Sequence, residues 1–564
     1  MRLRYFILLS ALCVLLTELH AQEDDPWKFR LSANAGLSSE IYSIDSDSAG
    51  AVRARRPGTL SRLILNASLN SRYISLPFTI VLSNNQTNYT TPKAGDQSFW
   101  QYLQNPMNTL RFSPRFGRAQ FHLGSYIPDY SELSTGNAHV FGGGFDLRPG
   151  DFQIRAFYGS SQRAIGPDSV KNIRGAYGRE FFAAKLGHGE LDSGSIAFNF
   201  VMVKDDTNSV ESRPAGLFPE EGMLTSFEFS IPLIKDMLFT GELGVSIFTR
   251  NLYSDEADYG ELDFMNSFYD PKESTILDGA ATASLLIKKK LWGFEAKVLY
   301  MGDGYRPLGY NYLQSDRIEY TISPRARLLD NKLNLNATVG IRTNNLSDTK
   351  AQTTNNLLVA LNASYLIMNN LNLNASFMNY GVRNNTENDT LKIETVSRSI
   401  SVGPSYTMQT NWAVNTIMAN ISFDNYNDFN TISGVTGGNL TQAYMTGVIS
   451  NLTKTPLSLN LSINYMTNDV PDAALETMAL NIGGSYRMFN GKLVPSLRIT
   501  FSQYATGGNT SDTQFKVSPG IRYGLANSLS LSAEAYYNTY EYGSARQGIA
   551  FNENYLRLAL NYNF

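Results

Sequence analysis

The sequence predicts an all-β protein: a single large transmembrane antiparallel β-barrel of about 26 strands (24 to 28), with short turns at one end and long loops at the other. Three observations lead to this prediction. Apolar and polar residues alternate along many segments, tight-turn sequences recur at a hairpin-sized spacing, and many aromatic residues are combined with few charged ones. Each observation is weak alone, and together they favour a wall of strands that cross a membrane.

The last nine residues, 556–564, show the alternation most clearly. Since a β-strand sends alternate side chains to opposite faces, this segment has an apolar face and a mostly polar one. The apolar face holds Leu556, Leu558, Leu560, Tyr562 and Phe564. About nine to eleven tilted residues cross a bilayer. We therefore expect a closing strand with its leucines toward lipid and Arg557 toward the lumen, paired with the first strand near residues 29–37.

Short turns divide the second half of the chain into hairpins of roughly 36 to 44 residues. Asn490-Gly491 and Asn369-Asn370 are examples, because Asn and Gly tolerate the positive φ of tight turns. Longer polar segments alternate with them, such as residues 384–390 and 506–512. The first half follows the same pattern with more interruptions, and no boundary separates a second domain.

Residues 1–21 are expected to be a signal peptide. Arg2 and Arg4 precede an apolar run that is too short for a spanning helix, and Ala21 supplies a small residue before the expected cleavage. The barrel then comprises residues 22–564. The only cysteine, Cys13, lies within the signal, so the mature chain is expected to have no disulfide.

Composition limits the classes of function. Hydrophobic residues make up 43% of the chain and charged residues only 17%, with 32 Tyr and 31 Phe, yet no long apolar run follows the signal. Alternation with Asn, Ser, Thr and Gly produces such a composition. The formal net charge of −3 gives no indication of nucleic-acid binding.

Soluble all-β folds explain the pattern less well. A sandwich uses shorter strands with turns every 8 to 12 residues or so, and this length would require many domains. A propeller would show a fixed motif in each blade, and the sequence has none. The membrane barrel is therefore favoured.

The N-terminal signal, the hairpins with alternating faces and the ending Tyr562-Asn563-Phe564 resemble the Gram-negative outer-membrane β-barrel proteins. The resemblance extends over the whole mature chain and is architectural, without pointing to a specific family. It implies a location in the outer membrane, contact with outer-membrane lipid, and recognition by the barrel assembly machinery, for which Phe564 would be the signal.

The polar faces of the predicted strands should line the lumen, because lipid does not satisfy polar groups. This assigns to the lumen wall Arg118, His122, Arg155, Glu295, Lys297, Arg325, Arg327, Arg342, Arg498, Lys516, Arg522, Glu534 and Arg557. Basic residues predominate, so one interpretation is a wall that favours anionic solutes. The other, which we favour, is that these charges pair across strands in a watery lumen.

Two inserts interrupt the strand pattern. Residues 89–110 include the apolar cluster Phe99, Trp100 and Tyr102, and residues 251–274 combine acidic and aromatic side chains. A barrel of this size would breach the membrane without an obstruction, so either insert could narrow the lumen. A crown of outward loops is an equal alternative for both.

Sites for catalysis, metals or cofactors are not expected. The mature chain has only three histidines, and it lacks a Gly-x-Ser-x-Gly elbow and a His-Glu-x-x-His helix. His122 is more simply a wall residue than a base. The segment starting at Asp45 resembles a calcium loop, but Arg56 occupies the place of the closing Glu.

The favoured function is a porin-like channel or transporter for polar solutes, with a lumen restricted by loops, and not an enzyme. The alternative is a non-conducting barrel that serves as scaffold or docking component of a secretion, surface-anchoring or uptake complex, with a partner protein at its loops. The pattern indicates neither the substrate nor the oligomeric state.

Overall fold

The computed structural model describes most of the chain. The described residues are 29–46, 52–84, 108–168, 172–211, 213, 216–257, 269–308, 313–430, 432, 437–471, 473–507, 509–543 and 548–563. The signal peptide predicted at residues 1–21 lies outside these ranges.

Strands account for most of the described chain. The first half contains β1 (Arg30–Ser46), β2 (Thr59–Asn70), β3 (Ile74–Ser83), β4 (Thr109–Phe112), β5 (Arg115–Phe116), β6 (Ala119–Tyr126), β7 (Val140–Leu147), β8 (Phe152–Gln162), β9 (Gly178–Glu190), β10 (Gly194–Asp206), β11 (Glu221–Ile234), β12 (Met237–Thr249), β13 (Thr275–Lys288) and β14 (Trp292–Met301). The second half contains β15 (Arg317–Leu328), β16 (Leu333–Asn344), β17 (Thr354–Met368), β18 (Leu371–Asn384), β19 (Glu394–Gln409), β20 (Ala413–Asp428), β21 (Asn439–Leu452), β22 (Leu457–Val470), β23 (Ala473–Tyr486), β24 (Leu493–Thr506), β25 (Asn509–Gly524), β26 (Leu529–Tyr542) and β27 (Phe551–Asn563).

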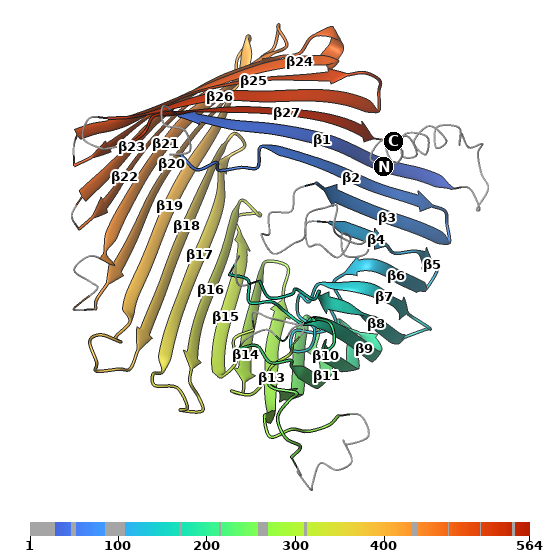
Figure 1. The fold of residues 1–564 in the computed structure, drawn as a ribbon. Coiled ribbons are helices and arrows are strands. Elements are labelled where there is room, and N and C mark those ends of the chain that lie inside the picture. Colours follow the sequence, from blue (N-terminus) through green and yellow to red (C-terminus); the bar gives the residue numbers. More distant parts are fainter. Residues whose placement is uncertain are drawn as a thin grey trace.

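These strands form one closed antiparallel barrel. Each strand pairs with the next along the chain, and β27 returns to pair with β1 (Figure 1). The exception is β4 and β5, which do not pair with each other. Both lie between β3 and β6, so they are two pieces of one interrupted strand and the 27 labelled strands form a wall of 26. The predicted fold class and strand number are confirmed. Closure leaves no sheet edge exposed to lipid.

The last strand closes the barrel as predicted. Residues 34–46 of β1 pair with residues 551–563 of β27, with Leu37 opposite Leu560 and Glu40 opposite Arg557. Opposite residues of an antiparallel pair share a face, and the Arg557 Nε lies 3.8 Å from a Glu40 carboxylate oxygen. The partner strand extends further than the expected segment 29–37. Phe564, the predicted assembly signal, lies outside the described residues.

The two ends of the barrel differ. Tight turns join β15 to β16 and β23 to β24, where Asn331 and Asn490 adopt positive φ. Long connections, such as those between β6 and β7 and between β14 and β15, lie at the opposite end. The long loop expected at residues 506–512 was wrong, because β24 reaches Thr506 and β25 already begins at Asn509. Alternation continues into these residues, so the strands extend beyond the polar stretch that resembled a loop.

The two faces of the wall have different neighbours. Large apolar side chains such as Leu558, Ile400 and Leu361 are exposed on one face. Connecting segments 127–139 and 302–308 contact the other face, which is therefore the inner one. The exposed apolar face is what lipid would cover. Among the described residues, no helix has the length and apolar character needed to span a membrane.

Candidate functional site

One side of the barrel is filled from within. We call the strands β6 to β14 the sealed sector, and residues 127–139, which join β6 to β7, the inner loop. The inner faces of this sector form a continuous apolar cluster with the inner loop and with residues 305–308. The cluster contains Tyr130, Leu133, Ala138, Val140, Phe157, Phe181, Ala183, Val201, Val203, Leu224, Phe248, Ala280, Leu299, Met301, Tyr305 and Leu308. This part of the lumen is packed like the core of a soluble protein.

Glu242 of β12 anchors the centre of the inner loop. One carboxylate oxygen accepts a hydrogen bond from the Ser131 hydroxyl at 2.5 Å, and the other accepts from the Leu133 backbone N–H at 3.2 Å. The Glu242 side chain is only 4% exposed. Both oxygens therefore have partners, which is what allows a carboxylate to be buried here.

Two lysines, one on β9 and one on β14, hold the same loop on either side of β12. The Lys185 ammonium donates to the Tyr130 carbonyl oxygen at 2.6 Å and to Glu228 at 2.7 Å. The Lys297 ammonium lies 2.6 Å from Glu132. Polar atoms of the inner loop thus bind charged side chains of the wall, and the Leu133 side chain packs in the apolar cluster.

The connection between β14 and β15 also binds the inner loop. Tyr305, between β14 and β15, is 1% exposed, and its hydroxyl donates to the Leu133 carbonyl oxygen at 2.7 Å. Burial raises the pKa of the Tyr305 phenol above its ordinary value, so the group remains a neutral donor. A Cβ at position 244 would approach the Tyr305 hydroxyl to 2.7 Å, so Gly244 on β12 is needed for this contact. The next residue, Arg306, donates its backbone N–H to Ser246 at 3.1 Å.

Several charged residues elsewhere in the sealed sector are paired, among them Arg179. The Arg179 guanidinium lies 2.6 Å from Asp205 and 2.9 Å from Glu220. His122 stacks on Tyr126 with ring centroids 4.0 Å apart, contacts the Ser113 hydroxyl at 3.2 Å, and is 4% exposed. The predicted wall position of His122 thus lies inside the packing, where it is not accessible to solutes.

The remaining strands form the open sector, β15 to β27 followed by β1 to β5. Inward positions of β17, β18 and β19, all three fully described, hold no charged side chain. Leu358, Ala360, Met378, Tyr380 and Val382 lie toward the long loops and Leu366 lies near the short turn, and the inward positions between them are Asn, Ser, Thr and Gly. This part of the inner wall is therefore polar and uncharged.

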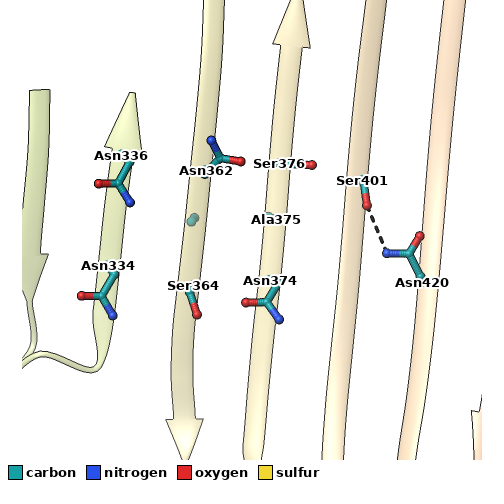
Figure 2. Close-up of a pocket in the computed structure, with 10 residues that line it drawn as sticks. Asn334, Asn336, Asn362, Ser364, Asn374, Ala375, Ser376, Ser401 and Asn420 are labelled. Atoms are coloured by element: carbon teal, nitrogen blue, oxygen red, sulfur yellow. Dashed lines mark hydrogen bonds between the residues drawn. The ribbon is translucent and has the colours of Figure 1, made fainter. Parts of the chain in front are cut away.

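Figure 2 shows a pocket on this neutral wall, with a volume of about 240 Å³. One row of inward residues runs across four strands, from Asn336 to Asn362, Ser376 and Ser401, and Asn420 donates to Ser401 at 3.1 Å. The other inward side chains of the pocket are Asn334, Ser364 and Asn374. These side chains are hydroxyls and amides, and they leave a shallow hollow on the inner wall.

Basic residues gather further round the open sector, on β24 and β25. Arg498, Lys516 and Arg522 point inward and make no ion pair with any described residue. The Lys516 ammonium lies 4.1 Å from the centre of the Tyr536 ring. By contrast, Arg342 pairs with Glu319 at 2.8 Å. Charge pairing thus holds for part of the predicted wall, and an uncompensated basic strip remains on β24 and β25.

The loop between β1 and β2 brings two more arginines to the inner face, at β27. The Arg55 guanidinium lies 4.9 Å from the Phe551 ring centre and 3.9 Å from Glu553, which accepts a hydrogen bond from Tyr42 at 2.7 Å. The Arg56 guanidinium lies 5.2 Å from the Tyr555 ring centre. Sequence analysis had considered this loop only for calcium, and its basic run was the overlooked indication of an inward position.

Most of the predicted lumen residues lie on the inner face of the ladder. These are His122, Arg155, Glu295, Lys297, Arg325, Arg327, Arg342, Arg498, Lys516, Arg522, Glu534 and Arg557. Arg118 is the exception, because it lies in the tight turn between β5 and β6, next to Gly117 with φ of +57°. The sequence prediction continued the strand alternation into the turn that precedes β6, where Arg118 lies.

The two predicted inserts have different outcomes. Phe99, Trp100 and Tyr102 of the insert 89–110 lie outside the described residues. In the insert 251–274, Tyr269 packs against Met223 and Ile247, whose side chains lie on the outer face, opposite that of Glu242. The described end of this insert therefore belongs to the exterior of the barrel.

Sequence analysis did not identify the inner loop as the obstruction. The composition of the inner loop is ordinary, but the sequence of a wall strand against which it packs is not. Residues 198–203, Phe-Asn-Phe-Val-Met-Val, are apolar at nearly every position. A strand that is apolar on both faces is covered on both, here by lipid outside and by protein inside.

The sequence matches no protein-family model, and no curated protein is significantly similar to it. Several solved membrane barrels resemble the structure distantly. The P pilus usher (PapC) translocation pore is 10% identical, with 94% of this chain and 98% of that chain covered and a TM-score of 0.36. OccK11 (OpdR) of Pseudomonas aeruginosa is 10% identical, with 95% and 96% covered and a TM-score of 0.30. OccAB2 of Acinetobacter baumannii is 11% identical, with 66% and 99% covered and a TM-score of 0.30. Likenesses this distant carry no information about function, and the barrel rests on its own strand ladder.

Proposed function

We propose that this chain is an outer-membrane channel that passes polar solutes along the open sector of its lumen. The observation that carries the proposal is the asymmetry of the inner wall. Inner connections fill the side of β6 to β14, while β16 to β20 present amides and hydroxyls around a hollow that no described connection fills. A purely structural barrel would have no need of such a polar, uncharged inner surface on one side only.

The dimensions of the wall support a restricted lumen. With strands about 4.8 Å apart and tilted by about 40°, 26 strands enclose a backbone ring about 50 Å wide if circular. An opening of that width would breach the permeability barrier. The inner loop and its partner at Tyr305 supply an obstruction that leaves the neutral wall free.

Reconstitution in planar bilayers tests the proposal. Purified full-length protein is expected to give stepwise conductance, and neutral polymers of increasing size should reveal a width far below that of the empty ring. A variant lacking residues 129–137 should conduct more. Absence of steps from both proteins would contradict the channel. A stoichiometric partner that co-purifies with a silent barrel would then favour the scaffold alternative.

A further inference from the structure

The neutral wall of Figure 2 has unused hydrogen-bonding capacity. Asn334, Asn336, Asn362 and Asn374 make no side-chain hydrogen bond with any other described residue, and neither do the hydroxyls of Ser364 and Ser376. In the figure, only Ser401 and Asn420 are joined by a hydrogen bond. Four amides and two hydroxyls are therefore available to a ligand or to water.

The chemistry of these groups restricts the ligand. Each Asn amide offers two N–H donors and a carbonyl acceptor, and each Ser hydroxyl both donates and accepts. A ligand with hydroxyls that do both can match such a surface at every point. Over β17 to β19 a charged ligand would lose hydration without finding a counter-charge, because the inward positions there carry none. The nearest inward charges are Arg325 and Arg327 on β15, which stand opposite Asn336 and Asn334 at one edge of the site.

The arrangement of the groups indicates an extended ligand. The side chains stand on adjacent strands about 4.8 Å apart and on alternate residues about 6.8 Å apart, so they form a two-dimensional grid. Ala363 and Ala375 also line the pocket, but they are out of phase with the inward residues, so every side chain that points into it is Asn or Ser. A polypeptide in transit would bring apolar side chains for which this grid has no recess, whereas a sugar chain presents hydroxyls along its length.

We propose that the inner wall of β16 to β20 is a binding site for a neutral carbohydrate chain. This inference rests on the proposed function, since the bound sugar would be the solute that the channel passes. The residues in contact would be Asn334, Asn336, Asn362, Ser364, Asn374 and Ser376. The site holds the chain by many weak hydrogen bonds, which permits movement along the wall.

Equilibrium dialysis with the full-length protein in detergent tests the site without requiring conductance. The probes are maltohexaose, a hexamer of galacturonic acid as its anionic counterpart, and hexaglycine as a peptide main chain. Maltohexaose is expected to bind saturably and more tightly than both others. Tighter binding of the anionic hexamer or of hexaglycine would overturn the carbohydrate assignment, the second in favour of a polypeptide.

A pair of variants locates the binding. Asn362→Leu with Asn374→Leu keeps the side-chain size and removes two amides, so the affinity for maltohexaose should fall by about tenfold or more. Asn379→Leu is the matched control, because Asn379 is also on β18 but faces outward, and its affinity should stay within about twofold. Heat-modifiable electrophoretic migration verifies that each barrel is folded. Unchanged affinity in a folded double variant would overturn the site.

The two proposals fail separately. Conductance without saturable maltohexaose binding would leave the channel standing and refute the carbohydrate site. Saturable binding that the double variant abolishes, in a protein without conductance, would support the site and refute the channel.

Discussion

The sealed and open sectors belong to one wall, yet their inward side chains differ in polarity. In the sealed sector, inward residues such as Phe181 and Val203 are buried in an apolar cluster. In the open sector, inward residues at comparable depth are amides and hydroxyls, such as Asn362 and Ser401. The outer faces of both sectors carry exposed apolar residues. What differs is the inner face, which described segments of the chain cover in the sealed sector and do not cover at β17 to β19.

This difference shows what alternation reports. Strands alternate when their two faces meet different media, and lose the alternation when both faces are covered by apolar groups. The apolar inner face of β10 therefore marks the position of a covering segment, whereas the polar inner face of β17 to β19 is not covered by any described segment. In other large barrels, strands that are apolar on both faces can indicate where a loop packs against the inner wall.

The sealed sector depends on a small number of buried groups. Leu133 is fully buried in the apolar cluster, and burying such a side chain contributes about 1.5 to 3 kcal/mol. The polar atoms around it are satisfied by Glu242, Lys185 and Tyr305. Changes at these positions should therefore shift the sealed sector toward the open one, by amounts that follow their burial.

Leu133→Asp should have the largest effect. It places a carboxylate in the apolar cluster near Glu242, and truncating a buried Leu alone costs about 2 to 5 kcal/mol. The inner loop should leave its seat, and the single-channel conductance should rise severalfold. Leu346→Asp, in the exposed loop after β16, is the control and should leave the conductance unchanged. Wild-type conductance in Leu133→Asp would mean that the inner loop does not restrict the path.

Arg498→Glu combined with Arg522→Glu should have an intermediate effect, on charge selectivity. Neither guanidinium pairs with a described carboxylate, so reversal should lower the anion-to-cation permeability ratio, measured from reversal potentials in a salt gradient. Arg118→Glu is the matched control, since Arg118 lies in a turn at the barrel rim. An unchanged ratio in the double variant would refute the interpretation that the basic strip favours anions.

Tyr305→Phe should have the smallest effect. It removes one hydrogen bond to the Leu133 carbonyl oxygen and keeps the buried ring, a loss of about 1 to 3 kcal/mol, because the acceptor remains buried. More frequent brief openings are expected in single-channel recordings, with little change in their amplitude. Tyr320→Phe, which faces outward on β15, should match the wild type. If openings are no more frequent than in that control, the Tyr305 hydrogen bond does not limit opening of the channel.

Much of the architecture could be predicted because it repeats locally. The period-2 pattern predicted the closing strand, the pairing of Arg557 with the first strand, and the inward direction of Arg342 and Arg498. It failed at Arg118, where a turn interrupts a pattern that continues in the sequence. The charge-pairing interpretation held for Arg342 but not for the strip on β24 and β25, because pairing depends on the neighbouring strand.

The sequence by itself determined the barrel, its strand number and which side chains share a face, since these follow from alternation and from turns between adjacent segments. Only the tertiary structure decided which connection fills the lumen. The Lys297–Glu132 ion pair and the Tyr305–Leu133 hydrogen bond each join residues more than 160 positions apart in the chain, with separations of 165 and 172. Such contacts depend on the curvature of the wall from β6 to β14, which brings the inner loop, Tyr305 and β14 together in space.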